Sequence, residues 1–131
     1  MIFIIQFITI DGAKETAGHY CPATKAGNII CISGQLPINP YTGEKCTGGI
    51  TEQTQQVLKN LDAILHAAKT DKTNVMKTTV YISDISLWDE VNTVYAQYFG
   101  SHRPARAIVP TKELHHGFFI ELEAMAFTAE S

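Results

Sequence analysis

The sequence predicts an α+β protein in which a mixed β-sheet carries two helices packed on one face. Runs of β-branched and aromatic residues, typical of strands, occur near both ends of the chain and in its middle. Two longer segments repeat their apolar residues with the 3.6-residue period of an amphipathic helix, and a strand separates them. The chain has 131 residues, 45% of them hydrophobic, and we expect a single domain over residues 1–131.

The first third of the chain predicts two strands and two turns. Residues 2–10 are rich in Ile and Phe, and residues 28–33 form a second run of this kind that ends at Gly34. Residues 40–43 have Pro and Gly spaced for a tight turn, and the Gly-Gly pair at 48–49 marks another break. The apolar start lacks a basic segment and is too short to span a bilayer, so we expect an edge or barrel strand there.

The middle of the chain predicts a helix, a strand and a second helix. Residues 51–69 carry one apolar stripe, formed by Val57, Leu61, Ile64, Leu65 and Ala68. Residues 75–83 alternate as a strand, with one face formed by Met76, Val80 and Ile82. The second helix begins at Ser86, whose spacing to Asp89 is that of a capping box, and ends at Gly100. We interpret its stripe as core: Trp88, Val91, Val94, Tyr95 and Tyr98.

The last third predicts two strands, at about 105–109 and 118–127, and the final strand alternates throughout. One of its faces is a continuous core face, formed by Phe118, Ile120, Leu122, Ala124 and Ala126. The other face mixes two carboxylates with large apolar groups: Phe119, Glu121, Glu123, Met125 and Phe127. A face that met only water would not need three such apolar side chains, so we expect a second subunit to cover it.

Glu121, Glu123 and Arg106 are the candidate functional residues that the pattern itself supplies. Carboxylates among apolar groups should be paired, hydrogen-bonded or shifted in pKa. Arg106 lies in an otherwise apolar strand, and its planar guanidinium suits bidentate binding of a carboxylate. Together they predict a pocket for a small acid, with one anchoring cation and one acid/base group. In the alternative, given equal weight, Lys77 or an exposed edge satisfies the two carboxylates.

Composition argues against several classes of partner. The chain has ten Lys+Arg against 13 Asp+Glu, a net charge of −3, and its only arginines are Arg103 and Arg106. This balance disfavours a nucleic-acid or acidic-membrane surface, which normally shows a clustered basic face. The three cysteines, Cys21, Cys31 and Cys46, are odd in number and widely spaced. We therefore expect reduced thiols in a cytoplasmic protein.

The sequence predicts no metal and no organic cofactor. None of the five histidines has the spacing of a zinc-binding motif, and the adjacent His115 and His116 should point apart on an extended chain. The Gly-Gly pair at 48–49 lacks the Lys-Ser/Thr of a phosphate loop.

Seven short motifs recur in the same order as in a known family. They are Gly18-His-Tyr-Cys-Pro-Ala23, Ser33-Gly-Gln-Leu-Pro37, Gln53-Thr-x-Gln-Val-Leu-x-Asn-Leu61, Lys77-Thr-Thr-Val80, Glu90-Val-Asn-x-Val-Tyr95, Pro104-Ala-Arg106 and Ile120-Glu-Leu-Glu-Ala124. Over nearly its whole length the chain resembles the RidA/YjgF family.

This resemblance implies a chorismate-mutase-like fold, assembled as a homotrimer with clefts between subunits. It implies a 2-iminobutanoate/2-iminopropanoate deaminase, which hydrolyses reactive 2-imino acids to 2-oxo acids and ammonia without a cofactor. Arg106 matches the arginine that binds the substrate carboxylate in this family, and Glu121 matches the glutamate that positions or activates the attacking water. The matching positions that line the cleft are Tyr20, Ser33, Gly34, Asn92 and the backbone of Ile108.

Two other functions stay open at this point. One is a non-catalytic protein that binds a 2-oxo acid or another small carboxylate in the same clefts. The other is the endoribonuclease or translation-inhibitor activity attributed to part of the family, which the net charge of −3 disfavours. The chain also departs from the family near the cleft, with Ile108 where several members have Cys and His115 where Pro often follows Leu. We expect these changes to affect substrate range.

Overall fold

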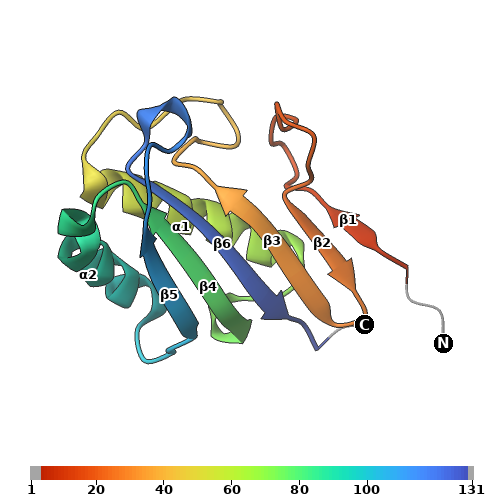
Figure 1. Cartoon of the computed structure of the whole chain (residues 1–131). Helices are drawn as coiled ribbons and strands as arrows, with labels where there is room; N and C mark the ends of the chain where they lie inside the picture. The colour runs from red at the N-terminus through yellow and green to blue at the C-terminus, as the bar shows by residue number, and fades with distance from the viewer. Residues whose placement is uncertain (1–3, 130–131) are drawn as a thin grey trace.

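The computed structural model describes residues 4–129, which form a six-stranded sheet and two α-helices (Figure 1). Along the chain the elements are β1 (Gln6–Ile8), β2 (Ala23–Ala26), β3 (Ile29–Gln35), α1 (Ile50–Ala67), β4 (Val75–Ile82), α2 (Trp88–Phe99), β5 (Ala105–Pro110) and β6 (Ile120–Phe127). Short 3-10 turns lie at Lys72–Asn74, Ile85–Leu87 and His115–Gly117. The strand order is β1-β2-β3-β6-β4-β5, so β1 and β5 lie at the edges.

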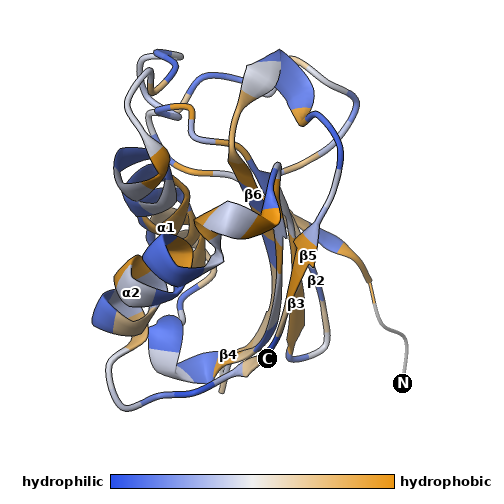
Figure 2. Cartoon of the chain, turned by 60° about the vertical axis from the view of Figure 1, so that its left-hand side comes forward, coloured by the Kyte–Doolittle hydropathy of each residue, from blue (hydrophilic) through white to orange (hydrophobic). Residues whose placement is uncertain are grey.

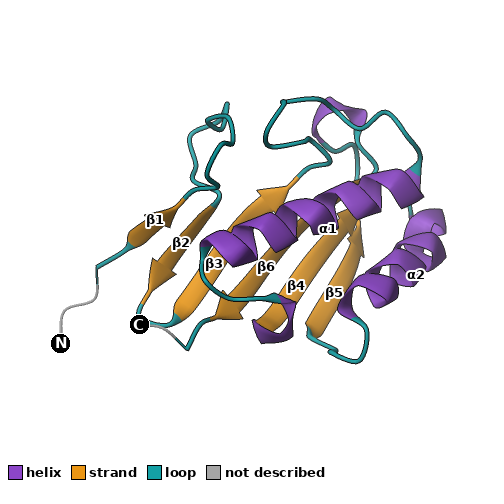
Figure 3. Ribbon diagram, turned by 180° about the vertical axis from the view of Figure 1, so that it is seen from behind, coloured by secondary structure: helices purple, strands orange, loops and turns teal. Residues whose placement is uncertain are grey.

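The predicted fold class is confirmed. Strands β4 and β5 are parallel and α2 connects them, whereas the other neighbouring strands pair antiparallel. Both helices cover the same face of the sheet (Figures 2 and 3). Helix α1 contacts α2, β6 and β3, and its buried stripe includes the residues predicted from the 3.6-residue period. The core therefore lies between the helices and one face, and the opposite face is open.

Most predicted elements agree with the structure to within a few residues at their ends. Strand β1 occupies Gln6–Ile8 of the predicted 2–10 and is an edge strand as expected; residues 1–3 lie outside the described residues. Strand β3 continues through Gly34 instead of ending there. The tight turn at 40–43 is confirmed, because Gly43 has φ +77° and its N–H donates to the carbonyl of Asn39.

Three expectations about local structure are wrong. Strand β2 was not predicted, and its residues Ala-Thr-Lys-Ala pair with both β1 and β3. The predicted capping box between Ser86 and Asp89 does not form: α2 follows Leu87 without a side-chain cap, and Asp84 instead caps the 3-10 turn Ile85–Leu87 by accepting from the backbone N–H of Ser86 (2.8 Å). Met76 is exposed because the pairing of β4 with β6 shifts register between Val75 and Lys77, which buries Val75 in its place.

The two faces of β6 differ as predicted. Phe118, Ile120, Leu122 and Ala126 are buried, and Ala124 packs against the core. The open face exposes several large apolar side chains of the sheet, among them Ile29, Phe119, Met125 and Phe127, each about two-fifths exposed. In this chain alone, a broad apolar sheet surface therefore faces outward.

Candidate functional site

The Glu121 carboxyl lies against a backbone irregularity in the neighbouring strand. The pairing of β3 with β6 shifts register between Ile32 and Gln35, and Ser33 and Gly34 occupy this bulge. A Cβ atom added at Gly34 would overlap Glu121 Oε2. Because Gly34 has no side chain, the carboxyl can rest directly on the β3 backbone. The bulge thus brings together the predicted site residues Ser33, Gly34 and Glu121.

Glu121 is a half-buried carboxyl beside a second one. Its burial raises its pKa above the ordinary value, the charge of Glu123 raises it further, and His115 lowers it. Glu123 accepts a hydrogen bond from Tyr81 Oη (2.7 Å). In the alternative, Lys77 or an exposed edge satisfies the two carboxylates; the hydrogen-bond partner of Glu123 is the Tyr81 phenol and not Lys77, and Glu123 is exposed. Glu121 combines partial burial with a raised pKa, a combination typical of a carboxylate that acts as a general base.

The loop before β2 extends this region toward the predicted Tyr20. Ser33 Oγ donates to the carbonyl of Cys21 (2.6 Å), and Ser33 N donates to that of Pro22 (3.0 Å). These bonds attach the loop to the bulge in β3. Tyr20, next in sequence to Cys21, is 53% exposed, and Thr16 Oγ1 donates to its carbonyl (2.7 Å). Tyr20 therefore lies beside the residues that attach this loop to the bulge, with its ring against Gly18 and its side chain exposed.

Arg106 lies on β5 under α2. Its Nη1 donates to Asn92 Oδ1 (2.9 Å), and its Cζ lies 4.7 Å from the centre of the Tyr95 ring and 5.5 Å from that of Trp88. Ile108, two residues along β5, has the same orientation and packs against the core. The structure therefore brings together Arg106, Asn92 and Ile108, a second group of predicted residues.

The two groups lie on opposite faces of the sheet. Arg106 contacts α2 on the helix-covered face, whereas Glu121 alternates with Ile120 and Leu122, which are buried on that face. Glu121 consequently points to the open face. One chain presents the cation on one side of the sheet and the carboxyl on the other.

The His115–Gly117 turn lies immediately before β6. His115 and His116 stack, with ring centres 3.7 Å apart, so the expectation that they point apart is wrong. His116 has φ +60°, a left-handed conformation that folds the chain back on itself and brings the rings together. Burial and the charges of His115 and Lys45 lower the pKa of His116. The prediction that the two rings point apart was made for an extended backbone, and it therefore did not anticipate this stacked pair.

Gln53 connects α1 to the strand that carries Glu121. Its Nε2 donates to the carbonyl of Gly48 (3.0 Å), and its Oε1 accepts from the backbone N–H of Phe119 (2.9 Å). Gln53 is buried, so this amide fixes the start of β6 relative to the helix.

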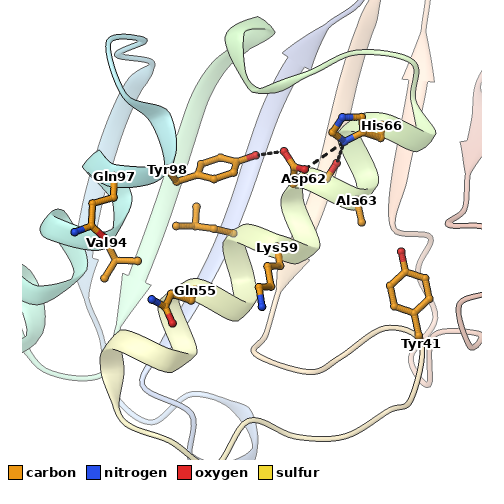
Figure 4. A pocket seen from close by; sticks show the side chains of 10 residues that line it. Tyr41, Gln55, Lys59, Asp62, Ala63, His66, Val94, Gln97 and Tyr98 are labelled. Atoms are coloured by element: carbon orange, nitrogen blue, oxygen red, sulfur yellow. Dashed lines mark hydrogen bonds and ion pairs between the residues drawn. The ribbon is translucent and has the colours of Figure 1, made fainter.

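A separate groove of about 830 Å³ lies between the outer faces of α1 and α2 (Figure 4). Asp62 is at its centre: Tyr98 Oη donates to one carboxylate oxygen (2.7 Å), and His66 Nδ1 lies 3.3 Å from the other. The predicted site residues are absent from its described lining, and sequence analysis did not anticipate it. The Asp62 carboxylate is already paired with two side chains of the chain itself.

Metal-binding clusters and membrane-spanning helices are both absent from the described part of the chain. Residues 4–129 contain no group of three or more His, Cys, Asp or Glu side chains placed to hold a metal ion. Neither described helix combines the length and the apolarity that crossing a membrane requires. Cys21, Cys31 and Cys46 are free thiols.

Comparison with known proteins matches nearly the whole chain. Residues 11–128 match the model of the family described as Endoribonuclease L-PSP. A RutC family protein of Pyrococcus horikoshii is 44% identical over 122 residues, which cover 93% of this chain and 97% of that protein. The human protein named 2-iminobutanoate/2-iminopropanoate deaminase is 42% identical over 123 residues, with 94% and 90% covered.

Solved structures agree in fold. The crystal structure of RidA from an Antarctic Psychrobacter species matches with a TM-score of 0.88 at 35% identity, over 94% of this chain and 99% of that one. At this identity and coverage, the likeness extends over the whole sheet and both helices.

Proposed function

This chain belongs to the RidA family, whose model is described as Endoribonuclease L-PSP, and from that premise we propose that it is a 2-imino acid deaminase. The reaction adds water to the C=N carbon of a 2-imino acid and releases ammonia, leaving a 2-oxo acid. The proposal agrees with the printed name of the human relative, which is 42% identical. No metal or cofactor enters the scheme.

The observation that carries the proposal is the environment of Arg106. Its guanidinium has five N–H donors, and one nitrogen donates to Asn92 Oδ1. The remaining N–H groups can donate a pair of parallel hydrogen bonds, one to each oxygen of a small carboxylate. Binding the carboxylate fixes the adjacent C=N carbon in one orientation for attack.

Glu121 is proposed as the general base. Its carboxylate takes a proton from water as the water oxygen bonds to the imine carbon, and the C=N π electrons move to nitrogen. The proton then passes to nitrogen, which gives a neutral 2-amino-2-hydroxy acid. Glu121 next takes the proton of the new hydroxyl group and returns it to nitrogen, so the C–N bond breaks and ammonia leaves as the C=O bond forms. Because its pKa is raised above that of an ordinary glutamate, the Glu121 carboxylate is a stronger base than an exposed one, which favours its role in proton transfer.

We propose that a second copy of the chain completes the site. Arg106 and Glu121 lie on opposite faces of one sheet, so one substrate molecule cannot contact both within a single chain. The open face exposes Ile29, Met125 and Phe127, which a second copy would cover. A homotrimer, as the family resemblance implies, would place Arg106 of one copy beside Glu121 of another.

The test measures clearance of an imine generated in situ by a threonine or serine dehydratase. The purified protein should accelerate formation of the 2-oxo acid over buffer, and Arg106→Ala and Glu121→Gln should each remove most of the acceleration. Arg103→Ala is the matched control, because Arg103 is the chain's other arginine and is exposed. Carboxylate binding without any acceleration would overturn the proposal and identify a binding protein instead.

A further inference from the structure

Arg106 is held by three side chains from one helix face. Trp88, Asn92 and Tyr95 are spaced by four and three residues on α2, so they project from the same side of the helix. Asn92 Oδ1 accepts from Nη1 at the guanidinium edge, while the Tyr95 and Trp88 rings lie near Cζ, at 4.7 and 5.5 Å from their centres. Both distances are within the range of cation–π attraction.

The Tyr95 ring is itself fixed to the sheet. Its hydroxyl lies 2.7 Å from Thr78 Oγ1, and Thr78 is the residue paired with Arg106 between β4 and β5. On α2, the Phe99 ring packs against Tyr95 with centres 4.6 Å apart. Thr78 and Tyr95 are buried. The ring over Arg106 is therefore held at its hydroxyl end by the strand next to the arginine.

We propose that Trp88 and Tyr95 are positioning residues for Arg106. They hold the guanidinium plane so that its unused N–H groups meet a small carboxylate. This inference rests on the proposed function, in which Arg106 binds the carboxylate of a 2-imino acid. An unsupported arginine side chain samples many rotamers, and binding would then have to restrict them. The aromatic rings remove that freedom beforehand and leave the N–H edges for the ligand.

A purely structural role for these rings makes a different prediction. If Trp88 and Tyr95 only filled the core, replacing them would lower the melting temperature without changing how the folded protein binds a carboxylate. A positioning role changes KM and ligand affinity in protein that remains folded. Conservative replacement by another aromatic side chain should restore both.

The first experiment compares Trp88→Leu with Trp88→Phe in the imine assay. Trp88 is partly exposed, so both variants should fold, and circular dichroism checks this. Trp88→Leu should raise KM about 3- to 30-fold with little change in kcat, the range expected for one cation–π contact. Trp88→Phe should recover most of the loss. An unchanged KM in folded Trp88→Leu would overturn the inference.

Tyr95 provides an independent pair of variants. Tyr95→Phe keeps the ring and removes its contact with Thr78 Oγ1, so KM should rise less than in Tyr95→Leu, which removes the ring. Equal KM values for wild type and folded Tyr95→Leu would also contradict the positioning role.

Trp88 is the only tryptophan in the chain, so its fluorescence reports directly on this cluster. Titration with 2-oxobutanoate should change the emission saturably, and Arg106→Ala should abolish the change while Arg103→Ala retains it.

A saturable change in a protein that does not hydrolyse imines would refute the proposed function and leave the positioning role intact. Imine hydrolysis with the same KM in wild type and in Trp88→Leu would refute the positioning role and leave the proposed function intact. The absence of any emission change at saturating 2-oxobutanoate would count against the positioning role.

Discussion

At the residue scale, Gly34 determines where the Glu121 carboxyl can lie. The Glu121 Oε2 atom occupies the space that a side chain at position 34 would need. The bulge in β3 and the missing Cβ together allow a carboxyl to sit on the backbone, half-buried and with a raised pKa. A change at Gly34 should therefore affect chemistry more than folding.

Gly34→Ala should lower kcat by about 100-fold or more, because displacing a catalytic group by about 1 Å can cost that much. The Glu121 side chain is flexible and can move aside, so the melting temperature should change little. Gly49→Ala is the control, since its added Cβ would meet Glu52 Oε2 at an ordinary 3.4 Å. Wild-type kcat in Gly34→Ala would show that the position of this carboxyl is irrelevant to the reaction.

The pH dependence of activity should follow the pKa of Glu121. A general base must be ionised, and burial raises this pKa, so kcat/KM should fall on acidification at a higher pH than for an ordinary glutamate. Glu123→Gln removes the neighbouring negative charge that raises the pKa further. The acid limb of the profile should consequently move to lower pH in Glu123→Gln, and a shift to higher pH would contradict the assignment.

Sequence alternation was sufficient to single out Arg106 and Glu121 but not their surroundings. Each is a charged residue in a largely apolar strand, and that contrast is visible without a structure. The contact of Glu121 with Gly34 depends on the register between β3 and β6, which are far apart in sequence. The stacking of His115 on His116 depends on one left-handed residue that an extended-chain assumption excludes.

At the element scale, Asn60 attaches helix α1 to the loop that follows β3. It is buried, and its Nδ2 donates to the carbonyls of Leu36 (3.1 Å) and Ile38 (2.9 Å). Its Oδ1 accepts from Gln56 Nε2 (2.8 Å). One amide thus satisfies two backbone carbonyls at the end of the strand that carries Ser33 and Gly34.

Asn60→Ala should destabilise the protein by about 1–3 kcal/mol, since it removes a buried amide that donates to two backbone carbonyls and leaves the Leu36 carbonyl with only the N–H of Ile38. Urea unfolding at one fixed protein concentration measures this, because assembly would make stability concentration-dependent. Gln55→Ala, on the exposed side of the same helix, should change stability by no more than about 0.5 kcal/mol. Equal midpoints for the two variants would contradict this role of Asn60.

Hydrophobic periodicity predicted the helices and the apolar strands, because those elements bury a face of their own. Strand β2 has no such signal: Ala23–Ala26 forms a strand because β1 and β3 provide hydrogen-bonding partners on both sides. The predicted capping box at Ser86 does not form, because a 3-10 turn capped by Asp84 precedes α2 and Ser86 lies within that turn. The missed strand and the wrong cap have one cause: strand pairing and local backbone conformation determine them, and the apolar pattern carries no signal for either.

At the scale of the whole molecule, the sheet separates the two halves of the proposed site. Arg106 belongs to the helix-covered face near the β5 edge, and Glu121 belongs to the open face. The same open face exposes the apolar residues that the alternation of β6 predicted a second subunit would cover. The proposed assembly of several copies, with a site between two of them, would account for both the exposed apolar face and the separation of Arg106 from Glu121.

The measurement that tests this claim most directly is complementation between two inactive variants. Arg106→Ala and Glu121→Gln are co-expressed with different tags, and mixed oligomers are isolated and verified by native mass spectrometry. If each site takes Arg106 from one copy and Glu121 from another, every mixed trimer has one site in three with both native residues. Isolated mixed trimers should therefore recover about a third of wild-type activity. Mixed oligomers no more active than the separate variants would contradict it.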